Sequence, residues 1–286
     1  MKAVSPLRYP GGKAALAALL RQVVTLNRLG DRVLVEPFAG GPGASLTLLY
    51  GEDVSEILIN DIDQAIFHFW WSLIFKPKQF RNLLLKTPVN LTEWYRQRGI
   101  YRSHLRKSRL TSGFAAFYLN RCNRSGIIVD GGPIGGIAQN GKWLIDARFN
   151  KVELLSRCDK IAEYRDRIRV SGVDGMELLA SPDPKRVFYF IDPPYFEKGR
   201  LVYLNALSSR YHAELASRLK TLDNIPWVLT YDDCSEIRSL YSQWATIHPF
   251  GLRYVAAQRK VGKEILITPK WMKLPTKQES AAIAWR

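Results

Sequence analysis

Short apolar runs alternate with longer amphipathic ones along most of this chain. Runs of β-branched and aromatic residues, such as Arg186-Val-Phe-Tyr-Phe-Ile191, predict buried strands, and the longer runs between them predict helices. This alternation predicts an α/β fold. The expected strands are 32–36, 56–60, 167–171, 186–191, 227–231 and 264–268. The expected helices are 14–24, 44–49, 65–75, 111–120, 151–165 and 208–219.

The alternation lapses between residues 76 and 150. After the expected helix 111–120, the segments 121–126 and 130–136 contain too much glycine and polar sequence to pack as core, which predicts shaped loops. We interpret the region as an inserted lobe. Side chains of its first loop suit contacts with phosphates or base edges, and the candidates are Arg121, Asn123 and Arg124. The predicted domains are 1–75 with 165–286, and the insert 76–164.

The charge of the chain predicts the kind of partner that it binds. The net charge is +16 in 286 residues, which favours a polyanionic partner over a small acidic molecule. Solvated helix faces usually mix signs, but Glu93 is the only acid between Lys76 and Arg109. We therefore expect nucleic-acid contact in this stretch. Its other cations are Lys78, Arg81, Lys86, Arg96, Arg98, Arg102, Arg106 and Lys107.

Composition also argues against several classes of protein. No apolar run approaches transmembrane length and no signal-type hydrophobic region follows Met1, so we expect a cytoplasmic protein that does not enter membranes. The cysteines are widely spaced and the four histidines are scattered, so they form no metal-ligand pattern. Packing roles are the simpler interpretation for Cys122, Cys158 and Cys234.

The strongest chemical signal is Asp192-Pro193-Pro194-Tyr195, at the carboxyl end of an expected strand that the two prolines end. The Asp192 carboxylate and the Pro193 carbonyl can each accept a hydrogen from one amino group, while Tyr195 can stack on the ring that carries it. A plain strand-ending turn is the competing interpretation. The segment therefore predicts a grip for an amino-bearing heterocycle.

A nucleotide-type site is predicted earlier in the chain. The expected strand 32–36 leads into the glycine-rich turn 37–43 and then a helix, an order that lets a ligand approach the main chain closely. Asp61 follows the next expected strand, where folds of this kind bind ribose hydroxyls, whereas Asp63 suits a helix cap. The glycine-bearing segment before Lys13 can present amides to an anion at a helix start.

Four motifs in this order resemble the Dam-like family of DNA adenine-N6 methyltransferases: Tyr9-Pro-Gly-Gly-Lys13, Glu36-Pro-Phe-Ala-Gly-Gly-Pro-Gly43, Asn60-Asp61 and Asp192-Pro-Pro-Tyr195. The resemblance implies a Rossmann-like methyltransferase sheet with helices on both faces. It also implies a smaller, mainly helical and loop-rich DNA-recognition domain inserted between the second and third strands. The implied cofactor is S-adenosylmethionine, and the implied partner is double-stranded DNA.

The same resemblance assigns roles to residues. Tyr9, Lys13 and Asp61 would contact the cofactor, with Lys13 near its methionine part and Asp61 at its ribose. Asp174 would bind the cofactor's adenine amino group, and Asp192 would both border the cofactor and, with Pro193, Pro194 and Tyr195, hold the target base. The methionine side would be lined by Phe38, Ala39 and Gly40.

These expectations define a mechanism and its alternatives. An adenine flipped out of the duplex would receive the methyl group directly, because a stacked base cannot reach a buried donor. The four-residue grip does not distinguish adenine from other amino-bearing bases, so N4-cytosine or RNA methylation stays open, as does a catalytically silent nucleic-acid-binding protein. A bacterial or phage origin fits the resemblance. We expect a monomer on DNA, while the recognised sequence and a cognate restriction endonuclease are left open.

Overall fold

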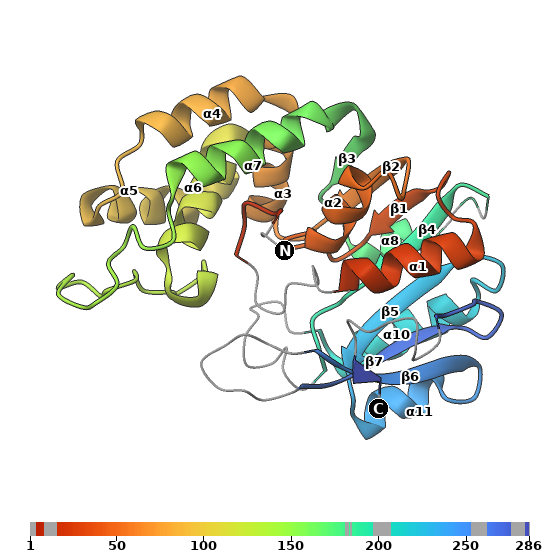
Figure 1. The fold of residues 1–286 in the computed structure, drawn as a ribbon. Helices are drawn as coiled ribbons and strands as arrows, with labels where there is room; N and C mark the ends of the chain where they lie inside the picture. Colours follow the sequence, from red (N-terminus) through yellow and green to blue (C-terminus); the bar gives the residue numbers. More distant parts are fainter. Residues whose placement is uncertain are drawn as a thin grey trace. The chain divides into compact units, whose positions relative to one another are not determined.

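All but one of the strands expected from the sequence pattern belong to the second of two compact units, where they are part of a mixed sheet (Figure 1). The computed structural model describes residues 4–8, 16–180, 183, 185–196, 207–252, 262–275 and 284–285. The first unit comprises Met1–Gly12 and Asp61–Gly172, and the second comprises Lys13–Asn60 and Val173–Arg286.

The second unit contains most of the strands. They are β1 (Val33–Glu36), β2 (Glu56–Asn60), β4 (Val187–Ile191), β5 (Trp227–Asp232), β6 (Ala245–Leu252), β7 (Gly262–Pro269) and β8 (Ala284–Trp285). The described helices of this unit are α1 (Ala17–Asn27), α2 (Gly43–Tyr50), α8 (Gly175–Leu178), α10 (Ser209–Lys220) and α11 (Ser235–Tyr241).

The strand order of this unit is β2-β1-β4-β5-β7-β6-β8. Strands β2, β1, β4 and β5 are parallel, whereas β7 runs antiparallel to both β5 and β6. Because β1 lies between β2 and β4, the strand order reverses beside β1. Loops that leave the carboxyl ends of strands at such a switch point diverge and leave room for a ligand.

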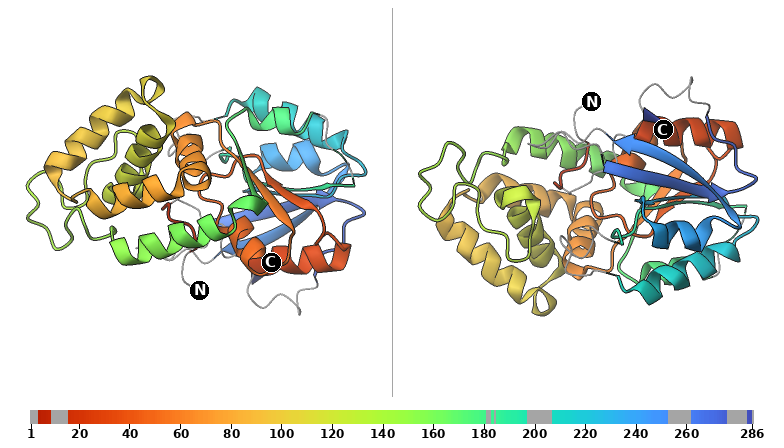
Figure 2. Two further views of the ribbon diagram at one scale, coloured as in Figure 1. Left: turned by 90° about the horizontal axis from the view of Figure 1, so that it is seen from above. Right: turned by 90° about the horizontal axis from the view of Figure 1, so that it is seen from below.

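Both faces of the sheet are covered. Neighbouring residues of β4, such as Phe190 and Ile191, point to opposite faces, and both are 0% exposed. Ile191 packs with Leu215 of α10 and Ile237 of α11 in one cluster. Figure 2 shows the red and orange helices α1 and α2 on the opposite face. This is the arrangement expected of a Rossmann-like sheet, so the predicted fold class is confirmed.

The first unit is mainly helical. Its helices are α3 (Gln64–Phe75), α4 (Pro77–Lys86), α5 (Leu91–Arg102), α6 (Arg109–Cys122) and α7 (Lys151–Glu163), with short 3₁₀ turns η2 (His104–Arg106), η3 (Arg124–Gly126) and η4 (Arg165–Arg167) and the strand β3 (Ile168–Ser171).

Close packing of α3 on α6 organises this unit. A Cβ atom at Gly113 would lie 2.4 Å from the His68 carbonyl oxygen, so only glycine lets the two helices approach this closely. The His68 ring contacts the Ser112 hydroxyl at 3.0 Å, and the rings of Phe69 and Phe117 stack 5.7 Å apart. Helix α3 is thus held in the first unit by both polar and aromatic contacts.

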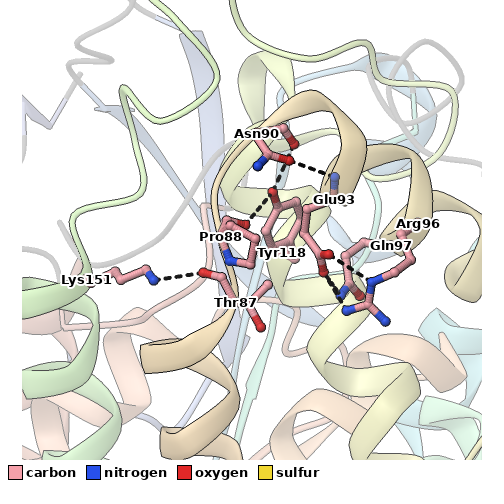
Figure 3. A network of polar contacts seen from close by, with 8 residues as sticks. All are labelled: Thr87, Pro88, Asn90, Glu93, Arg96, Gln97, Tyr118 and Lys151. Atoms are coloured by element: carbon pink, nitrogen blue, oxygen red, sulfur yellow. Dashed lines mark hydrogen bonds and ion pairs between the residues drawn. The ribbon is translucent and has the colours of Figure 1, made fainter.

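A polar network fixes the start of α5 (Figure 3). Asn90 caps the helix by accepting from the Glu93 amide at 2.8 Å, and the Tyr118 hydroxyl donates to the Pro88 carbonyl at 3.2 Å. Lys151 of α7 donates to the Thr87 carbonyl at 2.7 Å. Three elements distant in sequence are therefore joined at the turn between α4 and α5.

The compact units do not coincide with the predicted ranges 1–75 with 165–286 and 76–164. Helix α3, expected in the larger domain, packs on α6, so it falls within the first unit. The assignment of cofactor binding to one domain and DNA recognition to the other stays a prediction.

Every expected strand is confirmed, and the expected helices correspond to α1, α2, α3, α6, α7 and α10. Residues 14 and 15 of the first expected helix lie outside the described residues. Strand β6 was not predicted, because Pro249 and Gly251 interrupt its pattern and both residues are usually unfavourable in strands. In the described part of the chain, every helix is too short or too polar to span a membrane.

Candidate active site

The turn after β1 and the loop after β4 leave the same edge of the sheet from adjacent strands. The register pairs Val35 of β1 with Tyr189 of β4, and Ile191 of β4 with Leu229 of β5. The parallel strands therefore deliver the glycine-rich turn, the Asp192 loop and the end of β5 side by side. Here the second unit brings together the motifs that predicted a nucleotide site and a base grip.

Asn60, the last residue of β2, clamps the turn after β1. Its side-chain amide donates to the Pro37 and Val173 carbonyls, each at 2.9 Å, and its backbone carbonyl accepts from the Ala39 amide at 2.8 Å. Gly40 adopts a positive φ of 49°, a conformation that favours glycine. The turn is thereby tied to the segment that leads into α8. Sequence reasoning quoted Asn60 within a motif without giving it a role.

Phe38 and Asp174, predicted at opposite ends of a cofactor, both contact Tyr211. The Asp174 carboxylate caps α8 by accepting from the Met176 amide at 2.9 Å, and it also accepts from the Tyr211 hydroxyl at 2.5 Å. The Tyr211 ring meets Phe38 edge-on with centroids 6.4 Å apart. A Cβ at Gly175 would lie 2.7 Å from the Phe38 ring, so a side chain at this position would require the ring to shift. Tyr211 of α10 was missed in the sequence because it lies within an ordinary amphipathic helix.

The Asp192 carboxylate is oriented from the neighbouring strand. Thr230 of β5, which is 0% exposed, donates its hydroxyl to Asp192 Oδ1 at 2.5 Å. Asp192 itself is half-buried. A carboxylate held in this way keeps a defined direction at the carboxyl end of β4, as a hydrogen-bond acceptor for a bound base requires.

Two buried carboxylates hold the residues that follow the prolines. The Tyr195 hydroxyl donates to Glu264 Oε2 at 2.8 Å, and the Phe196 amide donates to Asp232 Oδ1 at 3.2 Å. Ring contacts accompany these bonds, since Tyr195 lies 6.3 Å from the ring of Tyr231. The loop is therefore anchored to β5 and β7 by both backbone and side chain.

Glu36 is a third buried acid at this edge. Its side chain accepts from the Ser45 hydroxyl, and the residue is 4% exposed. The pKa of Glu36 is raised to about 8, chiefly because the group is buried; the Ser45 hydrogen bond opposes this shift, and the nearby Asp192 carboxylate adds to it. At neutral pH this carboxyl group is therefore mostly protonated and adds little negative charge beside Asp192.

Comparison with known proteins identifies the chain. The family model for D12 class N6 adenine-specific DNA methyltransferases matches residues 9–261. The chain belongs to that family. The methyltransferase thus acts on the N6 amino group of adenine in DNA, and the cytosine, RNA and catalytically silent alternatives give way to this assignment. The family also implies a methyl donor.

Other comparisons add little to the family match. A search of curated proteins found no match. Among solved structures, the methyltransferase is similar to a conserved hypothetical protein of Streptococcus pyogenes at 8% identity, with a TM-score of 0.35, over 88% of this chain and 97% of that one. This likeness is too weak to carry an argument.

Of the remaining predicted cofactor residues, two are not described and one is counted with the first unit. Tyr9 and Lys13 of the methyltransferase lie outside the described residues. Asp61 follows Asn60 directly and is counted with the first unit, where its carboxylate accepts from the Asp63 amide at 2.9 Å. Asp63 caps α3 through the Ala65 amide at 2.8 Å, as the sequence predicted. A ribose contact by Asp61 stays a prediction.

Two of the three predicted DNA-binding side chains are buried in the first unit. Arg121 is 7% exposed and donates to the Arg148 carbonyl through Nε at 2.7 Å. Asn123 is 0% exposed, accepts from the Trp94 indole at 2.7 Å and donates to the Ile127 carbonyl at 2.7 Å. Direct DNA contact by either side chain would require these bonds to break.

Arg124 differs from its two neighbours because it is exposed, while its backbone amide bonds the Gly132 carbonyl at 3.0 Å. Asn123 therefore shapes the loop that carries Arg124, whereas Arg121 lies in the last turn of α6 and bonds the Arg148 carbonyl. A glycine-rich sequence indicated the loop, but burial of its polar side chains depends on helices α5 and α6, which sequence reasoning could not place against it.

Cations cover the surface of α4, α5 and η2. Arg98 is half-buried over the Trp94 ring at 5.2 Å, and Arg109 lies 5.4 Å from the Phe67 ring and 5.2 Å from the Trp71 ring. The exposed cations of this surface are Lys76, Lys78, Arg81, Lys86, Arg96, Arg102, Arg106, Lys107 and Arg109.

In the described residues, no group of three or more acidic, histidine or cysteine side chains is placed to bind a metal ion. Binding of phosphate by the cations of α4, α5 and η2 needs no such group.

Proposed function

We propose that the protein transfers a methyl group from S-adenosylmethionine to an adenine flipped out of duplex DNA, with the loop 192–195 as its base-binding element. The observation that carries the proposal is the Asp192 carboxylate, oriented by Thr230 at the end of β4 and adjacent to the turn after β1. A hydrogen-bond acceptor at this switch point can meet both a base and a methyl donor.

The chain's own groups prepare the amino nitrogen. Its lone pair is conjugated with the ring, so it is a poor nucleophile until acceptors draw its hydrogens and favour a pyramidal geometry. Asp192 and the Pro193 carbonyl supply those acceptors, and Tyr195 supplies a face for stacking. A hydrogen bond to a charged acceptor contributes roughly 1.5–3 kcal/mol, so orientation of the base must supply much of the remaining barrier reduction.

The transfer balances without any further reactant. The amino nitrogen would form a bond to the methyl carbon as the carbon–sulfur bond of the donor breaks with its electron pair on sulfur, and the nitrogen would release one proton to solvent. When bound, S-adenosylmethionine supplies a methyl group on positively charged sulfur. Glu36, protonated at neutral pH, leaves the Asp192 carboxylate as the principal charged acceptor in this part of the site.

The donor set of the second unit fits this cofactor. Asp174 offers a carboxylate to an adenine amino group, and the adjacent rings of Phe38 and Tyr211 offer apolar surface for a heterocycle. The turn that contains Ala39 and Gly40 offers backbone groups to the amino-acid part. Lys13 and Tyr9 join the proposed set on the strength of the sequence motif alone.

We further propose the first unit as the DNA-recognition unit. The exposed cations of α4, α5 and η2 can neutralise phosphates and so offset the cost of extruding a base, which is about a few kcal/mol. Arg124 is exposed on a loop held from behind by Asn123. Later in the stretch between η3 and α7, Trp143 is 61% exposed and lies beside Lys142. This pair suits stacking on a base next to a phosphate.

The test is incubation of purified protein with labelled S-adenosylmethionine and unmethylated genomic DNA, followed by nucleoside analysis and sequencing of the modified sites. We expect N6-methyladenine at a fixed short motif. Asp192→Ala should slow transfer by at least about a thousandfold, while cofactor binding stays measurable by calorimetry. Near-normal turnover of Asp192→Ala would overturn the role assigned to this side chain.

A further inference from the structure

Strands β5 and β7 place two buried carboxylates directly opposite each other. The register pairs Asp232 with Glu264, and the two residues are 3% and 0% exposed. Directly opposed residues of an antiparallel pair project from the same face of the sheet, where two like charges destabilise the pairing. Burying a carboxylate is costly unless it accepts hydrogen bonds. We therefore expect both carboxylates to accept hydrogen bonds that offset the free energy of burying them.

Their partners lie in consecutive residues of the loop after β4. Glu264 accepts from the Tyr195 hydroxyl at 2.8 Å, and Asp232 accepts from the Phe196 amide at 3.2 Å. One bond fixes the outer end of an aromatic side chain, and the other fixes the backbone immediately beyond it. Together they determine both where the Tyr195 ring lies and how it is turned.

The ring has further support from the same strand. Tyr231 of β5 lies 6.3 Å from the Tyr195 ring, and its own hydroxyl contacts His212 Nδ1 at 2.6 Å. The Phe196 ring lies 5.3 Å from His212. Neither carboxylate belongs to the motif that grips the base, yet both act on residues within or next to it. Both acids therefore support the base-binding loop from the strands behind it.

We propose that Glu264 and Asp232 are positioning residues that hold the Tyr195 ring at the height and angle required for stacking on the target adenine. This inference rests on the proposed function, since it assigns the ring to the base. Glu264 sets the ring through its hydroxyl, and Asp232 sets the main chain that follows. Loss of either bond lets the base tilt away from Asp192, so methyl transfer slows while cofactor binding does not change.

The experiment is a double-mutant cycle on methyl transfer, with Tyr195→Phe, Glu264→Gln and both together, on duplexes that contain the motif modified by the wild type. Tyr195→Phe keeps the ring but removes its hydroxyl, and we expect kcat to fall about tenfold, as for loss of one hydrogen bond to a charged group. Glu264→Gln keeps an acceptor and should cost only about threefold. When Tyr195→Phe is already present, Glu264→Gln should add nothing.

A spectroscopic measurement separates positioning from folding. With 2-aminopurine at the target adenine, stacking on Tyr195 should quench its fluorescence in the wild type, and Glu264→Ala should relieve the quenching while calorimetric cofactor affinity is retained. Asp232→Asn, which keeps an oxygen acceptor, should lie closer to wild type than Asp232→Ala. Glu214→Gln, a matched change at an exposed residue of α10, should leave kcat and fluorescence unchanged.

The possible failures are distinguishable. A wild type that methylates no adenine would overturn the proposed function and this inference with it. An active wild type in which the losses from Tyr195→Phe and Glu264→Gln simply multiply would overturn the inference alone, because independent effects mean that the two side chains do not act through their mutual bond. Unchanged 2-aminopurine quenching in Glu264→Ala would do the same.

Discussion

A buried glutamate in each unit has a shifted pKa, and the two pKa values are shifted in opposite directions. Glu36, at the end of β1, is 4% exposed, and burial together with Asp192 raises its pKa to about 8. Glu93, in α5, is 8% exposed. Burial opposes ionisation there too, but hydrogen bonds from Arg96 and Gln97 hold the pKa of Glu93 below its usual value. Burial raises the pKa of both groups, so hydrogen-bonding partners decide whether the net pKa shift is upward or downward.

The difference separates two uses of charge. At the sheet edge of the second unit, a buried acid lies close to another acid, and burial together with that neighbour lets Glu36 keep its proton. In the first unit, an internal acid is neutralised by a guanidinium while other cations stay exposed to solvent. Under the proposed function, the perturbed carboxyl group lies beside the base-binding loop of one unit, and the exposed cations form the proposed DNA surface of the other.

The largest expected effect tests the neutral acid. Between pH about 4.5 and about 8, folded Glu36 retains a proton that the unfolded chain has released, so wild-type stability falls as pH rises through this window. Glu36→Gln has no such loss. Its free energy of unfolding should therefore gain on the wild type by about 1.4 kcal/mol per pH unit within the window. Urea denaturation at pH 5, 6, 7 and 8 measures the difference, on the order of a few kcal/mol.

If the free energy of unfolding depends on pH in the same way for the wild type and Glu36→Gln, the raised pKa assigned to Glu36 is wrong. The activity of the same variant tests the protonation of Glu36 independently. An amide beside Asp192 should preserve methyl transfer at neutral pH, because it resembles the protonated acid in shape and charge.

A smaller effect of opposite sign is expected for Glu93→Gln. A depressed pKa contributes stability that is present above about pH 4.5 and lost as pH falls through the folded value, so the wild type should hold its advantage at neutral pH and lose it in acid. The Arg96 side chain is 58% exposed, which screens the pair and limits the advantage to about 1 kcal/mol. Denaturation at pH 3.5 and 7 tests this. An advantage that grows in acid would contradict the assigned pairing.

The smallest effect concerns the exposed cations. Arg106→Gln with Lys107→Gln should leave kcat nearly unchanged and weaken DNA binding a few-fold, with the slope of log Kd against log salt reduced by about 0.9 for each lost phosphate contact. Lys220→Gln, at an exposed position of α10, is the matched control in the second unit and should leave the slope unaltered. Equal slopes for all three proteins would remove η2 from the proposed DNA surface.

Short-range patterns in the sequence predicted much of the fold. The strands 56–60 and 186–191 are continuous apolar runs, as expected of strands buried on both faces, and the structure confirms them as β2 and β4. Helices α4 and α5 escaped notice because their buried positions are few. Only Phe80 and Leu84 are buried in α4, and they alone do not give a clear period in a cationic sequence.

The candidate site divides in the same way. Asp192 was predicted because a carboxylate between a strand and two prolines has a recognisable neighbourhood in sequence, and Asp174 was predicted through the family resemblance. Thr230, Tyr211 and Glu264 were not, because each looks like an ordinary residue of a strand or helix and acts only through a distant partner. Asn123 shows the converse: its sequence setting suggested DNA contact, whereas the folded unit gives it the Trp94 indole and two loop carbonyls.

The sequence by itself determined the α/β class, the order of strands and helices, and the motifs that predict a base grip and a nucleotide turn. These depend on periodicity, glycine and proline, all of which act between near neighbours. The tertiary structure alone decided that β7 enters beside β5, that Glu264 faces Tyr195, and that Glu36 is buried deeply enough, near Asp192, to keep its proton. Such pairings depend on strand register and burial, which join residues far apart in the chain and leave no local trace in it.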